Sequence, residues 1–153
     1  MTLRPARPDD AAAIAVVHRT AMRVSLSFLP ELHTAEEDLS YFAERFLPAN
    51  TVWVAEIDGR VAGYIGFDAD WINHLYLLPE AQGQGIGPRL LAKALEDGRT
   101  RRAWTFQRNA RARRFYETRG FVLVELADGS GNEEKEPDAL YEWRAAEAPK
   151  EGL

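Results

Sequence analysis

The chain has 153 residues, which suits one domain with a hydrophobic core, and its lack of cysteine excludes disulfides, zinc–thiolate sites and a cysteine nucleophile. A net charge of −5 without a nucleic-acid-binding motif disfavours nucleic acid as a partner. No apolar run approaches the roughly 20 residues that span a membrane, and the N-terminus has no signal-peptide pattern, so we expect a cytoplasmic protein without membrane contact.

The N-terminal part of the sequence predicts a strand and a helix. Residues 2–6 form the strand, and Asp9 caps a helix that runs to about Val24. The apolar positions of this helix fall on one stripe at helical spacing, namely Ile14, Val17, Ala21 and Val24. A loop at residues 25–33 follows.

A second helix and a β-hairpin come next. Thr34 and Glu37 have the spacing of a capping box, which opens a helix that we expect to end near Phe46. Asp58-Gly59 is a strong hairpin signal between two alternating apolar segments. The sequence therefore predicts paired strands at residues 51–57 and 60–67.

Strands and helices alternate in the second half. We expect strands at residues 71–78, 103–107, 121–126 and 139–143, and helices at 86–98 and 109–119. The first of these helices should bury one face, made of Ile86, Leu90, Leu91, Ala94 and Leu95. Residues 127–138 form a polar loop, and residues 145–153 form a frayed tail after one domain at 1–144. Hairpins mixed with helices predict an α+β fold with a mixed sheet.

A glycine-rich run lies between the strand at 71–78 and the following helix, and reads Gln82-Gly83-Gln84-Gly85-Ile86-Gly87-Pro88. Glycine lets the backbone approach a ligand, and a helix start offers free N–H groups and a positive dipole end. The run therefore predicts a site for a phosphate or pyrophosphate. It lacks the Lys-Ser/Thr of a Walker loop, and Pro88 stands where a dinucleotide fingerprint needs its third glycine.

A second motif spans Asn109 to Phe121. Asn109 is a good N-cap, and Gly120 is a good C-terminal stop. Asn109, Ala112, Phe115 and Tyr116 share one side of the predicted helix. Alone, this pattern would also suit simple core packing.

Together the two motifs resemble the GNAT superfamily of N-acetyltransferases. The glycine run matches that family's Gln/Arg-x-x-Gly-x-Gly/Ala loop for acetyl-CoA, and the stretch from Asn109 matches its Asn-x-x-Ala-x-x-Phe-Tyr-x-x-x-Gly-Phe motif. The resemblance covers roughly residues 2–144. It implies a single-domain twisted sheet of about seven strands with four helices, in which two central parallel strands splay apart near Leu78 and Gln107. Pro88, which follows the glycine run, is a departure from the family pattern. A proline has no backbone N–H, so one donor that could face a phosphate is missing there.

The resemblance also implies how acetyl-CoA is held as co-substrate, with no metal. The backbone of Leu77 and Leu78 should hydrogen-bond the pantetheine arm, and Asn109 should touch the pantetheine or a water beside it. Gln82 stands where the family often has arginine. The pyrophosphate should lie on the backbone N–H groups of Gly83, Gln84, Gly85, Ile86 and Gly87.

The implied reaction is direct attack of a primary amine on the thioester within a ternary complex. Tyr116 matches the family's tyrosine, and its phenol could donate a proton to the departing thiolate as general acid. His74 is a candidate general base, since its ordinary pKa suits that task. Glu56, Asp68 and Asp70 are alternative bases, and a water chain to solvent would also serve.

The acceptor is framed, in the resembled family, by the segment between the first two helices and by the closing hairpin loop. Here the former offers Phe28, His33 and Tyr41, and the latter offers Glu133, Glu134, Glu136 and Asp138. We expect a small amine, with a peptide amine as the alternative acceptor. A non-catalytic acyl-CoA-binding sensor or interaction module on the same fold is the alternative function. Homodimers are common in the family, so a homodimer is a further expectation.

Overall fold

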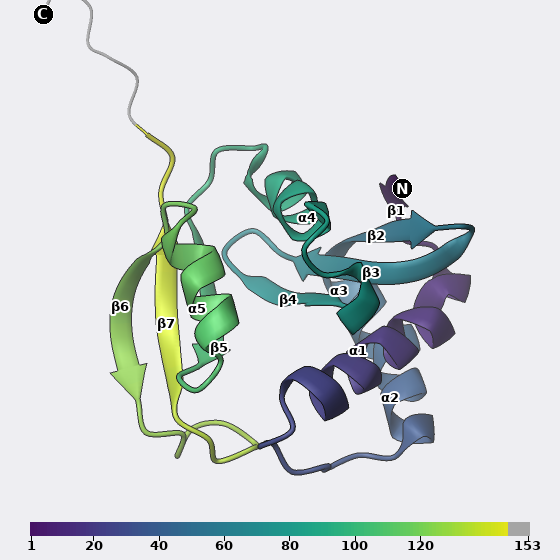
Figure 1. Cartoon of the computed structure of the whole chain (residues 1–153), viewed down its shortest axis with the longest axis horizontal. Coiled ribbons are helices and arrows are strands. Elements are labelled where there is room, and N and C mark those ends of the chain that lie inside the picture. The colour runs from purple at the N-terminus through teal and green to yellow at the C-terminus, as the bar shows by residue number, and fades with distance from the viewer. Residues whose placement is uncertain (147–153) are drawn as a thin grey trace, which may run out of the picture.

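Seven strands form two antiparallel sheets (Figure 1). The computed structural model describes residues 1–146, so residues 147–153 of the predicted tail lie outside the described residues. The larger sheet has the order β1-β2-β3-β4, with strands at Thr2–Pro5, Thr51–Ile57, Arg60–Phe67 and Ile72–Leu77. The smaller sheet has the order β5-β7-β6, with strands at Arg101–Phe106, Asp138–Trp143 and Val122–Ala127. The predicted α+β class with seven strands is confirmed.

In the described part of the chain, one β-bridge joins the two sheets. Trp71, just before β4, forms a parallel bridge with Arg102 of β5, and the Arg102 N–H donates to the Asp70 carbonyl at 2.9 Å. Beyond this bridge no described residue of β4 pairs with β5. The predicted splayed pair thus takes the form of two separate sheets that diverge toward Leu77 and Phe106.

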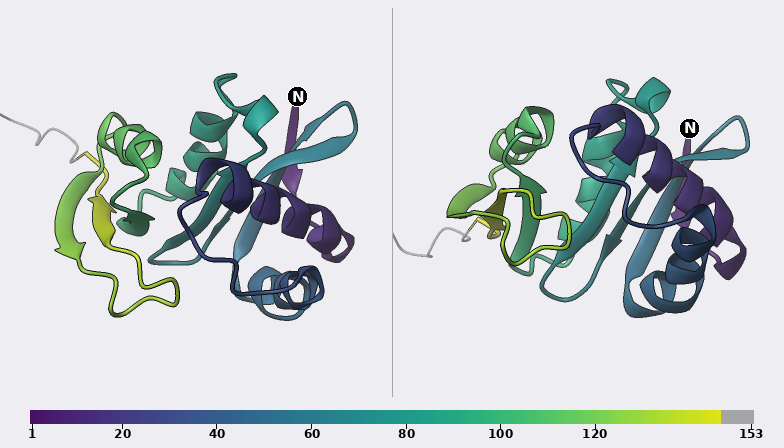
Figure 2. Two further views of the ribbon diagram at one scale, coloured as in Figure 1. Left: turned by 60° about the horizontal axis from the view of Figure 1, so that its bottom comes forward. Right: turned by 90° about the horizontal axis from the view of Figure 1, so that it is seen from below.

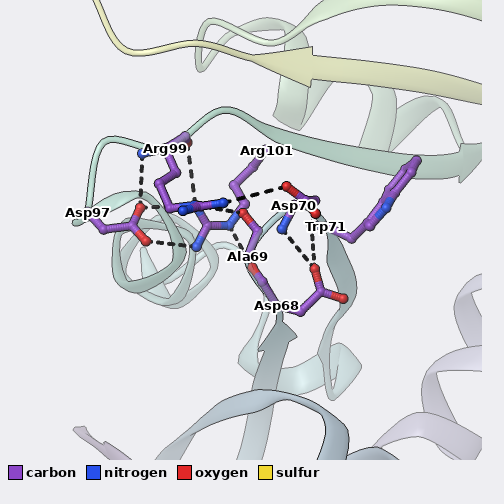
Figure 3. Close-up of polar contacts among 7 residues, drawn as sticks. All are labelled: Asp68, Ala69, Asp70, Trp71, Asp97, Arg99 and Arg101. Carbon is purple, nitrogen blue, oxygen red and sulfur yellow. Dashed lines mark hydrogen bonds and ion pairs between the residues drawn. The ribbon is translucent and has the colours of Figure 1, made fainter.

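A buried arginine holds this junction (Figure 3). Arg101 is only 2% exposed, and its Nη1 and Nη2 each donate to the Asp97 carboxylate at 3.0 Å. Its Nε donates to the Asp68 carbonyl at 2.9 Å. Asp68 in turn accepts the Asp70 and Trp71 N–H groups, at 2.9 and 2.8 Å. The β3–β4 turn and β5 are therefore joined through one guanidinium.

Helix α1, at Ala11–Ser25, follows a 3-10 turn at Pro8–Asp10. The predicted cap is off by one residue, because Asp10 precedes the helix and its carboxylate accepts the Arg7 N–H at 2.6 Å. The predicted stripe holds at Ile14, Val17 and Ala21, which are buried, but Val24 is 61% exposed. At 100° per residue, Val24 lies about 80° around the axis from Ile14, at the border of the buried stripe.

The second helical segment is longer than predicted. Helix α2 at Ala35–Tyr41 continues through a π-helical stretch at Phe42–Phe46 into α3 at Leu47–Ala49. Its predicted capping box is confirmed, with the Thr34 hydroxyl accepting the Glu37 N–H at 3.1 Å and the Glu37 carboxylate accepting the Thr34 N–H at 3.0 Å. Phe42 and Phe46 lie four residues apart on one face, and both rings are buried in the cluster that contains Val54 and Tyr64.

Helices cover both faces of the larger sheet (Figure 2). Helix α1 and the π-helical stretch after α2 pack on the face that carries Val54 and Tyr64, and α4 at Ile86–Leu95 packs on the opposite face. The predicted inward face of α4 is confirmed, with Leu95 partly buried and the rest buried. Helix α5, at Ala110–Glu117, lies against the smaller sheet. The fold therefore places α1, α4 and α5 around the point where β4 and β5 diverge.

Candidate active site

A cavity of about 430 Å³ lies beside β4 and α5, on the side of β4 that faces away from β3. Its walls come from β4, the glycine-rich loop, α5 and the end of α1. Of the residues predicted to form the site, the cavity brings together Leu77, Gln82, Gly83, Gly85, Gly87, Asn109 and Tyr116. These residues are up to 39 positions apart in sequence, and the packing of β4, the glycine-rich loop and α5 around one cavity brings them together.

Strand β4 presents backbone groups to this cavity. The Leu78 N–H donates to the Ala62 carbonyl at 2.8 Å, and Leu77 lies opposite Gly63 in the antiparallel register. Because hydrogen-bonded and non-hydrogen-bonded pairs alternate, the N–H and C=O of Leu77 point away from β3, toward the gap. The Leu78 N–H is engaged by Ala62, and the Leu78 carbonyl accepts the Ala81 N–H at 2.9 Å. The contact expected between Leu78 and the pantetheine arm stays a prediction.

The glycine-rich loop opens the N-terminus of α4 toward the cavity. Gly83 and Gly85 have φ values of 76° and 80°, and an added Cβ at either would meet no atom within 4 Å. Glycine is required there for the left-handed backbone, and the space beside both residues is open. The helix then begins at Ile86, and its first N–H groups lack carbonyl partners in the helix. The loop thus forms a backbone cradle that fits an anionic group.

Two of the predicted loop residues lie elsewhere. The Gln84 side chain donates to the Glu80 carbonyl at 2.8 Å, and Ile86 is 1% exposed within the core. Only their backbone can face a ligand. Arg111 and Arg119 of the α5 segment line the cavity instead and bring positive charge that the motif comparison did not assign.

Helix α5 supplies two side chains. The Asn109 Oδ1 accepts the Ala112 N–H at 3.1 Å, so the predicted cap is confirmed, and the amide group remains for a ligand. Tyr116 is 7% exposed, with its ring 4.9 Å from that of Phe121. Burial raises the pKa of the Tyr116 phenol well above its usual value. The phenol hydrogen-bonds no described residue, so its proton is available for donation.

His74 does not reach this cavity. Its Nδ1 lies 2.9 Å from the Tyr64 hydroxyl, and its ring packs 4.4 Å from that of Phe46, between the larger sheet and α2. Burial, with a smaller effect of His18, lowers the pKa of His74 to about 3. A side chain on a strand can lie on either face of the sheet, and the sequence alone did not show that His74 lies on the face with the aromatic core.

The alternative bases are also occupied elsewhere. Glu56 accepts from Arg4 Nε at 2.7 Å, and Asp68 caps the β3–β4 turn. Asp70 lies 3.7 Å from Arg99 at the junction of the two sheets. None of the three lines either of the cavities described here.

A second cavity, of about 210 Å³, lies between α1, the loop that follows it, α2 and the β6–β7 loop. Glu134 and His33 line it, as expected for residues that frame an acceptor, and so do His18, Arg19 and Asp38, which the motif comparison missed.

The other expected acceptor residues lie around this cavity rather than in it. Glu133 pairs with His33 Nε2 at 2.6 Å, and the Tyr41 ring is 43% exposed beside Phe42. Phe28 packs under the Arg108 guanidinium, which also binds Glu136. Asp138 accepts from Asn132 at 3.2 Å within the β6–β7 loop. His33 and Glu133 therefore join the two loops that frame the cavity.

The splayed strands, the glycine cradle and the cavity between them define an acyltransferase type of α+β fold. The model of the Acetyltransferase (GNAT) family matches residues 19–121, about two thirds of the chain. The chain belongs to this family. Within residues 1–146, no helix has the length and apolarity to cross a membrane, and no group of three His, Cys, Asp or Glu side chains is placed to hold a metal ion.

Relatives carry different acceptor names. The chain is 31% identical over 110 residues to the L-amino acid N-acyltransferase MnaT of Escherichia coli, a match that covers 65% of this chain and 63% of that protein. It is 26% identical over 125 residues to the peptidyl-lysine N-acetyltransferase YjaB of Salmonella typhimurium, which covers 81% of this chain and 85% of that protein. The chain thus spans less than two thirds of the length of the E. coli relative MnaT.

Among solved structures, the fold is similar to that of yncA, a putative acetyltransferase from Salmonella typhimurium solved with its cofactor acetyl-CoA. The TM-score is 0.74 at 22% identity, and the match covers 100% of this chain and 99% of that one. At this identity the likeness shows a shared fold.

Proposed function

We propose that the protein is an N-acetyltransferase that moves an acetyl group from acetyl-CoA to a small amine by direct attack in a ternary complex. The observation that carries this proposal is the 430 Å³ cavity, in which the free backbone of β4, the glycine cradle and the Tyr116 phenol face one space. Membership of the GNAT family supports the same reaction.

In this proposal each wall of the cavity holds one part of the co-substrate. The Leu77 backbone hydrogen-bonds the pantetheine arm, and the Asn109 amide supports it from α5. The N–H groups from Gly83 to Gly87 hold the pyrophosphate, with Gln82 beside them. Arg111 and Arg119 add positive charge at the mouth of the same cavity. Acetyl-CoA supplies an acetyl group on a thioester that an amine can attack.

Tyr116 acts as the general acid in this scheme. Its raised pKa keeps the phenol protonated at neutral pH, so a proton is ready for the departing sulfur. The smaller cavity holds the acceptor, with the Glu134 carboxylate at its wall as a partner for a cationic amine. Its volume of about 210 Å³ favours a small amine, such as an amino acid, over a folded protein surface.

A thiol-release assay tests the proposed reaction. Acetyl-CoA would be incubated with the protein and a panel of amines: L-methionine sulfone, spermidine, glucosamine, Nα-acetyl-lysine and a lysine-containing peptide. Thiol release that depends on a small amine supports the proposal. Acetylation of the lysine peptide alone would contradict the small-amine acceptor. Tight CoA binding by calorimetry without thiol release from any amine would favour the non-catalytic binding module.

We further propose that the protein forms a homodimer. Strand β6 is an edge strand of the smaller sheet, and Val122, Val124 and Leu126 are 68%, 50% and 55% exposed. An exposed apolar edge strand readily pairs with another chain. Sedimentation equilibrium would show a mass of two chains, and Val124→Lys would shift that mass toward one chain.

A further inference from the structure

One imidazole separates the two cavities. His18 of α1 lines the 210 Å³ cavity, and its ring meets the edge of the Tyr76 ring at 5.2 Å. Tyr76 lines the 430 Å³ cavity. On α1, His18 lies four residues after Ile14 and so falls within the buried stripe. The fold thus places a titratable ring on the wall between the proposed acceptor and co-substrate sites.

The hydrogen-bonding of this ring is incomplete. Within residues 1–146, His18 Nδ1 is the one buried side-chain nitrogen or oxygen without a hydrogen-bond partner. The ring is held by stacking instead, since it lies 5.2 Å from the His74 ring at an interplanar angle of 15°. Because Nδ1 is buried, it faces the protein interior and an amine in the cavity does not reach it. The other ring nitrogen, Nε2, is not among the buried atoms and has no hydrogen-bond partner among the described residues, so Nε2 is the atom that a ligand in the cavity can approach.

Charged groups surround the ring on the acceptor side. Arg19, His33, Asp38 and Glu134 line the same cavity, and Arg19 pairs with Asp38 at 2.9 Å. Burial lowers the pKa of His18 to about 4, the Asp38 carboxylate opposes that shift, and His33 adds to it. At neutral pH the ring is therefore uncharged and able to accept a hydrogen bond.

We propose that His18 is the catalytic residue that receives the proton of the acceptor amine. This inference rests on the proposed acetyl transfer. The amine nitrogen forms a bond to the acetyl carbon while the carbon–sulfur bond breaks. The bound ammonium first loses one proton to solvent, which frees the lone pair that attacks. As the bond forms, the amine gives its second proton to His18 Nε2, and the Tyr116 hydroxyl gives one to the sulfur. Solvent then removes the proton from His18 and reprotonates Tyr116, so the products are an N-acetylated amine and free CoA.

The surroundings of His18 suit this step. As the amine nitrogen gives up its lone pair, its proton becomes more acidic, so a weakly basic neutral ring suffices to take it. The Asp38 carboxylate stabilises the imidazolium that forms. His74 is not placed for the step, because its Nδ1 is already bonded to Tyr64 and its ring lies behind that of His18.

The test compares the wild-type protein with His18→Phe, which keeps an aromatic ring between His74 and Tyr76, and His18→Gln, which keeps a hydrogen-bonding group. The probe is the panel amine with the highest wild-type rate. Three quantities are measured for each protein: kcat and KM for that amine, the affinity for CoA by calorimetry, and the affinity for the amine without acetyl-CoA. His18→Ala with added imidazole provides a rescue arm.

We expect kcat with His18→Phe to fall by roughly 100-fold or more, the scale of a lost general base, with CoA affinity unchanged. Amine affinity should fall as well, and His18→Gln should restore the affinity but not kcat. Added imidazole should raise the rate of His18→Ala and leave the wild-type rate unchanged.

Wild-type turnover with equal kcat in all three variants would overturn the role of His18 and leave the proposed function standing. The absence of thiol release from the wild-type protein with every amine would overturn both. If His18→Phe fails to fold, the kcat of His18→Gln decides the matter, and full activity of that variant overturns the role.

Discussion

The Arg101 guanidinium and the Asp97 carboxylate face each other in parallel, with two hydrogen bonds of 3.0 Å between Nη1 and Oδ1 and between Nη2 and Oδ2. The pair lies where the two sheets make their single bridge (Figure 3). A bidentate pair has a fixed geometry, so it sets the position of β5 relative to the β3–β4 turn. The pair therefore fixes the end at which β4 and β5 lie closest together, next to the bridge between Trp71 and Arg102.

We predict that this pair makes stability depend on pH in the acidic range. The hydrogen bonds from Arg101 and Arg99 lower the pKa of Asp97 from 3.8 to about 2. A depressed folded-state pKa gives stability that is present above the unfolded value of 3.8 and is lost as pH falls toward 2. Urea unfolding of the wild-type protein and Asp97→Asn should therefore differ at pH 7, and the difference should shrink from pH 4 downward. A difference independent of pH would contradict the assignment.

Replacement of Tyr116 by phenylalanine should affect the chemical step and spare co-substrate binding. The phenol is 7% exposed, and phenylalanine keeps its packing against Phe121 while it removes the donor. We expect kcat to fall by roughly 100-fold or more, in line with loss of general acid catalysis. CoA affinity, measured by calorimetry, should be unchanged. Equal kcat values for the two proteins would remove Tyr116 from the mechanism.

Gly85→Ala should weaken CoA binding. Gly85 has a φ of 80° at the start of α4, where the added Cβ would enter the open space of the cradle. We expect the dissociation constant for CoA to rise about tenfold, which corresponds to ~1.4 kcal/mol. Gly59→Ala is a matched control, since Gly59 has a φ of 75° and equally open surroundings in the β2–β3 hairpin. Both variants should lose similar thermal stability, and only the first should lose CoA affinity.

Gly66→Ala should destabilise the fold. Gly66 is the next-to-last residue of β3, and a Cβ there would collide with the Phe46 ring. Because Phe46 is 2% exposed and packs against Tyr64 and His74, it has little room to move. Overpacking of this kind costs about 1–3 kcal/mol. Chemical unfolding measures the loss, and the double variant Gly66→Ala with Phe46→Leu should recover part of it.

Local patterns in the sequence predicted the elements well. The capping box at Thr34 and the cap at Asn109 form as expected, because each depends on residues within one turn. The motif comparison likewise gave seven of the seventeen residues that line the larger cavity. The predicted end of the second helical segment, Phe46, falls three residues before the observed end at Ala49, since a propensity pattern does not reveal a π-helical continuation.

The positions of side chains that are set by tertiary packing could not be predicted from local sequence patterns. His74 faces the aromatic cluster because the register of β4 on β3 puts it beside Tyr64, and that register involves residues ten positions away. His18 carries a signal in its spacing from Ile14, but the spacing shows burial only. Its place on the wall between two cavities depends on Tyr76, 58 residues further along the chain.

The single bridge between Trp71 and Arg102 has a consequence for how the chain moves when nothing fills the gap. The amide of Leu77 has no strand beside it on that side, so its hydrogen should exchange with solvent through small openings rather than global unfolding. A bound CoA would take the place of the missing strand neighbour and slow that exchange. If the proposed function holds, the pantetheine arm would fill the hydrogen bonds of β4 that a neighbouring strand supplies elsewhere, and this edge of the larger sheet would be more protected in the CoA-bound protein than in the free one.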